Sequence, residues 1–205
     1  MIEPSLNPVI DGLRQSATLS INQRSIALEK EGRKIYRFGL GQSPFPVPES
    51  VVQALREHAH EKDYLPVEGL MALREAVAEF HRAQEPLQIN AENVLIGPGS
   101  KELMFLVQLC FKGEIILSSP CWVSYGPQAR IAGKRVKRLM ATSATKWRLD
   151  PQELDAYCTN EPKTPRLLIL NYPGNPNGDT YSSEELEELA RIARKHRILV
   201  FSDEI

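Results

Sequence analysis

The sequence predicts an α/β domain built on a mainly parallel β-sheet. Two observations predict it: from Glu49 onward, short apolar runs of strand length alternate with segments of helical periodicity, and helix-start signals fall between them. Parallel strands require crossover connections, so this alternation favours repeated strand-helix-strand units. Because ligands bind at the carboxyl ends of the strands in such sheets, we searched those positions for functional residues.

The composition favours a globular protein with a small-molecule ligand. Of the 205 residues, 42% are hydrophobic and 25% are charged, which is enough to form one sizeable core. The net charge of -1 gives no field that would attract nucleic acid or an anionic membrane surface, and the longest apolar stretch, 103–111, is too short to span a bilayer. We therefore predict neither nucleic acid nor membrane as a partner.

The cysteines and the first residues predict a cytoplasmic protein. The three cysteines, Cys110, Cys121 and Cys158, are odd in number and far apart, so they predict neither a disulfide framework nor a metal site. Residues 1–12 lack a basic stretch followed by an apolar run, so no secretory signal is visible. We expect reduced thiols and no bound metal.

The first third of the chain predicts two helices and a rigid connection. A helix is expected from about Leu19 to Glu31 and ends at Gly32. Segment 41–48 contains three prolines, which exclude a helix or a central strand there. Four apolar residues share one face of the next helix: Leu70, Leu73, Val77 and Phe80.

Five short apolar runs are predicted to be strands. They cover residues 94–96, 115–117, 136–139, 167–170 and 198–201. A glycine turn after the first run opens a helix through Phe111 that we expect to be buried. Two later helices start at sequences that resemble capping boxes, at Asp150 and at Ser182. The helix after Ser182 presents one apolar face: Leu186, Leu189, Ala190 and Ala193.

The first two strand ends carry a glycine turn and an aromatic loop. Gly97–Lys101 opens a helix, whose free amides and dipole favour a phosphate; the alternative is a turn with an N-cap. It is neither a P-loop nor a dinucleotide fingerprint, which disfavours nucleotide binding. Trp122, in the loop after the second strand, either stacks on a flat heterocycle or is a packing residue.

Two further strand ends carry an amide and a carboxylate. Asn171–Gly178 is rich in turn formers, yet Asn175 is placed to present its amide to a cleft. Asp203 ends the last apolar run, where a carboxylate can hold a protonated ring nitrogen or a metal; the alternative is a helix cap. The acidic strand of an ATPase is disfavoured because no phosphate loop precedes it.

Seven groups of residues carry a family resemblance. They are Ser16–Thr18, Gly39–Pro48, Tyr64 with Gly69 and Leu73–Ala76, Gly97–Lys101, Pro120–Tyr125, Asn171–Gly178 and Ser202–Ile205. In this order they resemble the class I/II aminotransferases of fold type I, the aspartate-aminotransferase-like family that depends on pyridoxal 5'-phosphate (PLP). The resemblance implies a three-layer PLP-transferase domain with a mainly parallel sheet. Residues 1–45 would form an N-terminal arm and small-domain segment, and residues 46–205 an incomplete large PLP-binding domain.

The resemblance assigns three residues to the cofactor ring. Asp203 would pair with the pyridinium nitrogen and raise its pKa, as an opposite charge does. Asn175 would donate to the phenolate oxygen of the ring, and Trp122 would stack on its face. PLP acts as an electron sink, so these contacts suit its chemistry.

Other residues are assigned by the resemblance to the phosphate and the substrate. Gly99, Ser100 and Lys101 would bind the phosphate, largely through backbone amides. Tyr64 would reach the phosphate of a neighbouring subunit's cofactor, which implies a homodimer. Gly41 would lie near the substrate carboxylate.

The match departs from the family pattern in two motifs and lacks the catalytic lysine. Gln42, Ser43 and Pro44 replace the usual Glu-Pro-Asp, and Asn177 replaces a threonine. The aldimine lysine lies beyond Ile205, and Lys101, at the phosphate end, is no substitute for it. No catalytic residue is therefore expected within the chain, which we expect to be inactive alone. We also expect it to be unstable or to aggregate, because the predicted strand at 94–96 would lack its neighbours.

The function implied by the resemblance is amino transfer between an amino acid and a 2-keto acid. Two alternatives remain open: a non-catalytic remnant or half of a split enzyme, and a PLP-dependent lyase of the same fold. The sequence does not identify the amino acid.

Overall fold

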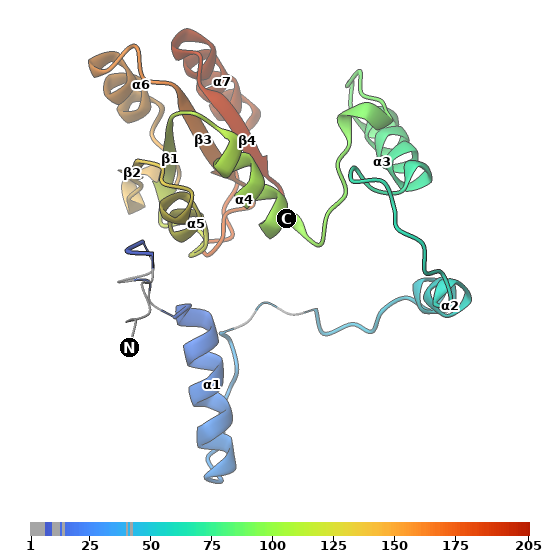
Figure 1. Ribbon diagram of the computed structural model, residues 1–205. Helices are drawn as coiled ribbons and strands as arrows, with labels where there is room; N and C mark the ends of the chain where they lie inside the picture. The colour runs from blue at the N-terminus through green and yellow to red at the C-terminus, as the bar shows by residue number, and fades with distance from the viewer. Residues whose placement is uncertain (1–6, 10–12, 14, 40, 42) are drawn as a thin grey trace, which may run out of the picture. The chain divides into compact units, whose positions relative to one another are not determined.

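The computed structural model describes residues 7–9, 13, 15–39, 41 and 43–205 and divides into two compact units (Figure 1). One unit comprises residues 21–103. The other comprises residues 104–205 with the chain up to residue 20. Each unit is described by itself. Gln42, in the predicted proline-rich segment, lies outside the described residues.

The second unit contains a four-stranded parallel sheet in the order β2-β1-β3-β4. The strands are β1 (Glu114–Ser119), β2 (Val136–Met140), β3 (Arg166–Asn171) and β4 (Leu199–Asp203). The crossovers contain α5 (Tyr125–Ile131), α6 (Pro151–Asn160) and α7 (Ser183–His196). These four strands and their direction confirm the parallel α/β prediction.

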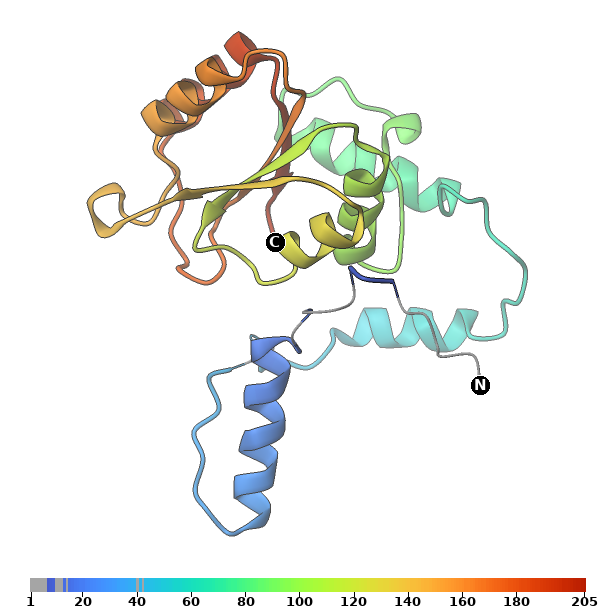
Figure 2. The same cartoon turned by 60° about the vertical axis from the view of Figure 1, so that its left-hand side comes forward.

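Helices cover both faces of this sheet, which gives three layers (Figures 1 and 2). Successive side chains of a strand point to opposite faces. Ile115 and Leu117 therefore pack with Met104 of α4 (Ser100–Cys110) and with α5, whereas Ile116 and Leu168 pack with α6 and α7. All these residues are buried, and the alternation explains why the predicted strands are apolar at every position.

The caps of α6 and α7 follow from local chemistry. Ser182 and Glu185 form the predicted capping box: the Ser182 hydroxyl accepts the Glu185 N–H at 3.3 Å, and the Glu185 carboxylate accepts the Ser182 N–H at 2.8 Å. Asp150 accepts the N–H of Gln152 at 2.8 Å. No reciprocal bond from Glu153 accompanies it, so this cap is simpler than predicted.

The first unit contains three helices and a short 3₁₀ turn. They are α1 (Ala17–Lys30), which begins just before this unit, α2 (Glu49–His58), α3 (Met71–Gln84) and the 3₁₀ turn η1 (Ala91–Asn93). Gly32 follows α1 with a φ of +83°, and its N–H donates to Glu29 O at 2.9 Å. The predicted glycine end of this helix is therefore confirmed.

The first predicted strand is wrong. Residues 94–97 form no regular secondary structure, and no described strand pairs with them. Their contacts are local: the Ile96 N–H donates to Glu68 O at 3.0 Å, and Ile96 lies against Gly69. Gly69 has a φ of +99°, and a Cβ there would lie 2.5 Å from the Ile96 Cβ, so only glycine fits this turn.

The predicted apolar face of α3 is not a core face among the described residues. Leu70, Leu73 and Phe80 are exposed, whereas Arg74 and Ala78 are buried. The Arg74 guanidinium donates to the carbonyls of Ala91 and Val94 at 3.1 and 2.9 Å, so it ties α3 to the chain after it. A side chain can thus be buried because it is hydrogen-bonded rather than because it is apolar.

The helix after the glycine turn is buried along one stripe only. In α4, Met104 and Gln108 are buried, while Leu106 and Leu109 are 41% and 49% exposed. The prediction of a fully buried helix is therefore wrong. The buried stripe faces the sheet, and the opposite side has no described cover.

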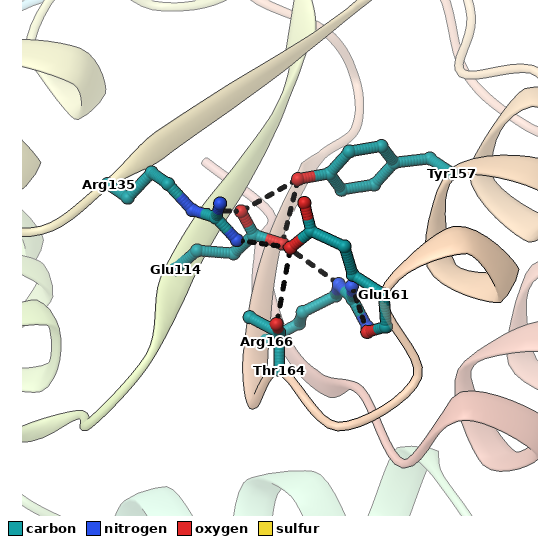
Figure 3. Close-up of polar contacts among 6 residues, drawn as sticks. All are labelled: Glu114, Arg135, Tyr157, Glu161, Thr164 and Arg166. Atoms are coloured by element: carbon teal, nitrogen blue, oxygen red, sulfur yellow. Dashed lines mark hydrogen bonds and ion pairs between the residues drawn. The ribbon is translucent and has the colours of Figure 1, made fainter.

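A polar network lies at the amino end of the sheet (Figure 3). We call it the amino-end cluster; its members are Glu114, Arg135, Tyr157, Glu161, Thr164 and Arg166. The buried Glu114 carboxylate lies 2.9 Å from Arg166 Nε and 3.0 Å from Arg135 Nε. The Tyr157 hydroxyl also donates to both carboxylate oxygens, at 3.0 and 2.8 Å.

No helix in the described part of the chain has the length and apolarity needed to cross a bilayer.

Candidate functional site

At the carboxyl end of the sheet, an aromatic pair lies beside a buried carboxylate. Trp122 and Tyr125 follow β1, and their rings meet edge to face with centroids 5.3 Å apart. Tyr125 begins α5 and is fully buried. Its hydroxyl donates to Asp203 Oδ2, at the end of β4.

Asp203 is a buried carboxylate that forms no ion pair with the described residues. It is 8% exposed and forms no salt bridge with any described residue. Within the described chain, the Tyr125 hydroxyl donates to Oδ2 of this carboxylate, and Oδ1 is not among the buried atoms that lack a partner. Buried carboxylates are normally paired with a cation or fully hydrogen-bonded, so this position favours a positively charged ligand.

The environment keeps Tyr125 protonated. Burial raises the pKa of the Tyr125 phenol well above its usual value, and the hydrogen bond to Asp203 raises it further. The phenol therefore remains a donor at neutral pH and fixes one oxygen of Asp203.

The Asn171–Gly178 loop joins this site through backbone contacts. The Asn175 N–H donates to Asn171 Oδ1 at 2.7 Å, and Asn171 Nδ2 donates to Asp203 O at 2.9 Å. Asn171, Asn175 and Tyr125 line the same small cavity of about 30 Å³. Asn175 itself is exposed, as a residue that meets a ligand must be before the ligand binds.

Cys121 and Arg138 flank the aromatic pair. Arg138 Nη1 donates to Cys121 Sγ at 3.7 Å. Burial raises the pKa of the Cys121 thiol, and the nearby Arg138 charge offsets part of that rise. Cys121 is therefore a neutral thiol that packs beside the site rather than a nucleophile.

A second, larger cavity in this unit lies away from these residues. It measures about 430 Å³ and opens between residues 144–152 and the first turns of α7, where Arg148, Tyr181 and Glu185 line it. Arg148 is paired with Glu185 at 2.6 Å. None of the predicted site residues lines this cavity, so it is not part of the predicted site.

The remaining predicted residues belong to the unit of residues 21–103. Gly99 has a φ of +97°, which favours glycine, and Ser100 begins α4. The first amides of a helix lack intrahelical acceptors, so this turn has the donors that a phosphate requires. Lys101 follows in the first turn. Tyr64 and Gly41 are both exposed. The roles of these five residues stay predictions.

Three predicted residues are thus linked through shared neighbours: Trp122, Asn175 and Asp203. The two connecting residues, Tyr125 and Asn171, were not among the predicted site residues. Tyr125 could have been found from its spacing, because it follows Trp122 by three residues at a helix start. Asn171 had a weaker signal, a lone polar residue at the end of an apolar strand.

A parallel sheet with helices on both faces defines an α/β domain of a class in which ligands bind at the carboxyl ends of the strands, where Asp203 lies. The family model "Aminotransferase class I and II" matches residues 33–205. The chain belongs to the class I and II aminotransferases. Members of this family depend on PLP, so the family and cofactor predictions are confirmed at the level of the family.

The chain is similar to known aminotransferases both in sequence and in structure. The chain is 31% identical to an aspartate aminotransferase of Bacillus sp. (strain YM-2), over 94% of this chain and 50% of that protein. It is 33% identical to the aspartate/prephenate aminotransferase of Thermus thermophilus, over 96% and 51%. The structure of the Thermus thermophilus aspartate aminotransferase with maleate superposes with a TM-score of 0.89 at 32% identity, over 98% of this chain and 53% of that one. The chain spans about half the length of the curated relatives it matches.

Proposed function

We propose that this protein takes part in PLP-dependent amino transfer between an amino acid and a 2-keto acid. The observation that carries the proposal is Asp203, a buried carboxylate that no described cation neutralises. A protonated pyridine nitrogen would supply a positive charge and a hydrogen-bond donor to this carboxylate. Bound PLP draws electrons away from the reacting carbon of the substrate, and it does so best when its ring nitrogen is protonated.

The described residues fit such a ring. Asp203 would hold the proton on the ring nitrogen, and Tyr125 would keep the carboxylate oriented through Oδ2. Trp122 would cover one face of the ring, supported edge to face by Tyr125. Asn175 would donate from its side-chain amide to the phenolate oxygen.

The proposal also assigns the phosphate, the subunit partner and the substrate. Gly99, Ser100 and Lys101 would hold the phosphate at the start of α4. Tyr64, with its side chain fully exposed, would reach the site of a second subunit in a homodimer. Gly41 would lie near the substrate carboxylate. Because relatives are named for aspartate, aspartate is the first amino donor to test.

The remaining parts of the proposal concern domains and location. Residues 1–45 would form the arm and small-domain segment, and residues 46–205 would belong to the large domain. All three cysteines are free, which is compatible with a reducing cytoplasm. Limited proteolysis would test the division, with the first cut expected near residue 45.

The binding test uses pyridoxamine 5'-phosphate (PMP), which has no aldehyde and therefore needs no covalent bond to a lysine. PMP absorbance and fluorescence are titrated with the purified chain and with Asp203→Asn. We expect saturable binding by the wild type and at least tenfold weaker binding by the variant. Equal affinities, or no binding by the wild type, would refute the proposed site. Because the chain alone is expected to be inactive, transfer from aspartate to a 2-keto acid is then assayed with PLP, with and without a second polypeptide that supplies the lysine; transfer only with that polypeptide would support the proposed reaction.

A further inference from the structure

Asn171 lies between two residues of the proposed site and contacts the backbone of both. It is the last residue of β3 and is half-buried. In the parallel register it pairs with Asp203, the last residue of β4. Its position is therefore fixed by the sheet, whereas Asn175 lies on the exposed loop that follows.

Both ends of the Asn171 side-chain amide are used. Nδ2 donates to Asp203 O at 2.9 Å, and Oδ1 accepts the Asn175 N–H at 2.7 Å. A carbonyl needs a donor and an N–H needs an acceptor, so these neighbours also fix which way the amide points. Of the common side chains, only an amide of this length supplies both groups here.

We propose that Asn171 is a positioning residue that sets the spacing between Asn175 and Asp203. This inference rests on the proposed function, in which Asp203 holds the ring nitrogen and Asn175 the phenolate oxygen of one cofactor. These two atoms occupy fixed positions on a rigid ring, so the residues that grip them must be held at a matching separation. A single rigid amide that bonds both backbones provides that constraint.

Two substitutions separate the two bonds. Asn171→Asp has nearly the same shape and retains the acceptor for the Asn175 N–H, but it loses the donor to Asp203 O. Asn171→Ala loses both bonds. Asn177→Asp is the matched control: the same chemical change is made in the exposed loop that follows Asn171, at a side chain whose Nδ2 makes a long 3.4 Å hydrogen bond to Trp147 O.

The first measurement is the dissociation constant of PMP. We expect about tenfold weaker binding for Asn171→Asp and Asn171→Ala, and a change of less than twofold for Asn177→Asp. Circular dichroism and thermal unfolding identify any variant that fails to fold. If Asn171→Ala fails to fold, the PMP affinity of Asn171→Asp decides, because that substitution adds no volume and opens no cavity.

The second measurement is one that a purely structural role would not change. The absorption band of bound PMP reports the protonation of the ring nitrogen. If Asn171 positions Asp203, the pH at which the bound ring loses its proton should move lower in Asn171→Ala, because Asp203 then raises the pKa of the ring nitrogen less. Asn171→Asp adds a negative charge that acts in the opposite direction, so this measurement is decided by Asn171→Ala. Hydrogen exchange without PMP should be faster at the Asn175 N–H in Asn171→Ala and unchanged in Asn171→Asp.

The outcomes separate this inference from the proposed function. Wild-type affinity in both Asn171 variants and an unshifted band in Asn171→Ala would overturn the inference while leaving the proposed function intact. Failure of the folded wild-type chain to bind PMP would refute the proposed site, and the inference with it.

Discussion

Glu114 and Asp203 are buried at opposite ends of the same parallel sheet, one at the start of β1 and the other at the end of β4. Each accepts a hydrogen bond from a tyrosine, Tyr157 or Tyr125. They differ in their cations. Glu114 has an arginine on each of its two oxygens, whereas Asp203 has none among the described residues.

The difference separates a structural carboxylate from a binding one. The charge of Glu114 is neutralised inside the chain, so the amino-end cluster needs no ligand. Burying the Asp203 carboxylate without a cation lowers the free energy of unfolding, compared with a site in which the carboxylate is paired. Proteins retain such sites where a ligand supplies the missing partner, and stability is then traded for binding.

The largest expected effect is at the amino end. Arg166→Met leaves Glu114 buried with one fewer cation, and we expect the free energy of unfolding to fall by about 3–5 kcal/mol. Urea denaturation measures it. The control is Arg191→Met, which breaks an exposed pair with Glu188 and should leave the free energy of unfolding almost unchanged. Equal stability of the two variants would show that the amino-end cluster is not structural.

The next effect concerns Asp203, at the carboxyl end, where we expect a substitution to weaken binding rather than stability. Asp203→Asn removes the buried charge but can still accept the Tyr125 hydrogen bond. We expect PMP to bind about 100-fold more weakly, roughly 2.7 kcal/mol, with no loss of stability. Parallel PMP titration and urea denaturation measure both quantities. A variant that loses stability but keeps PMP affinity would mean that Asp203 is structural, like Glu114.

The four strands and the helix caps could be predicted because their signals are local. A strand buried on both faces is apolar throughout, as 167–170 is, and a cap such as Ser182 with Glu185 lies within four residues. The sites at strand ends followed from the parallel topology, which brings Trp122 and Asp203 to one edge of the sheet.

The features that the sequence did not predict are those that depend on contacts with residues far away in the chain. Residues 94–96 have the composition of a strand, but a strand exists only when another pairs with it. Arg74 is buried because two carbonyls lie within its reach, which no periodicity predicts. The role of Asn171 depends on the register between β3 and β4, and that register is set by packing along both strands.

A smaller effect tests Tyr125, the tyrosine at the carboxyl end of the sheet. Tyr125→Phe removes the hydroxyl that donates to the Asp203 carboxylate, so we expect a loss of about 1–2 kcal/mol in the free energy of unfolding. PMP affinity should fall by less than in Asp203→Asn, because the charge remains. Tyr172→Phe is the control, since the Tyr172 hydroxyl makes only a long 3.3 Å bond to the exposed Glu204. Equal losses in the two variants would contradict a specific role for Tyr125.

The smallest expected effect is on the free energy of unfolding at alkaline pH. Burial, and then the hydrogen bond to Glu114, raises the pKa of Tyr157 to about 12, compared with about 10 in an unfolded chain. The unfolded phenol therefore loses its proton first, and the stability that Tyr157 contributes, complete below about pH 10, is lost as the pH rises through 12. Tyr157→Phe should show a shallower fall in unfolding free energy between these values, with the remaining slope coming from Tyr125 and Tyr181, whose pKa values burial also raises. Urea denaturation at several pH values, with tyrosinate absorbance at each, measures this. An unchanged slope would mean that the Tyr157 hydroxyl is free in solution and that Glu114 depends on its arginines alone.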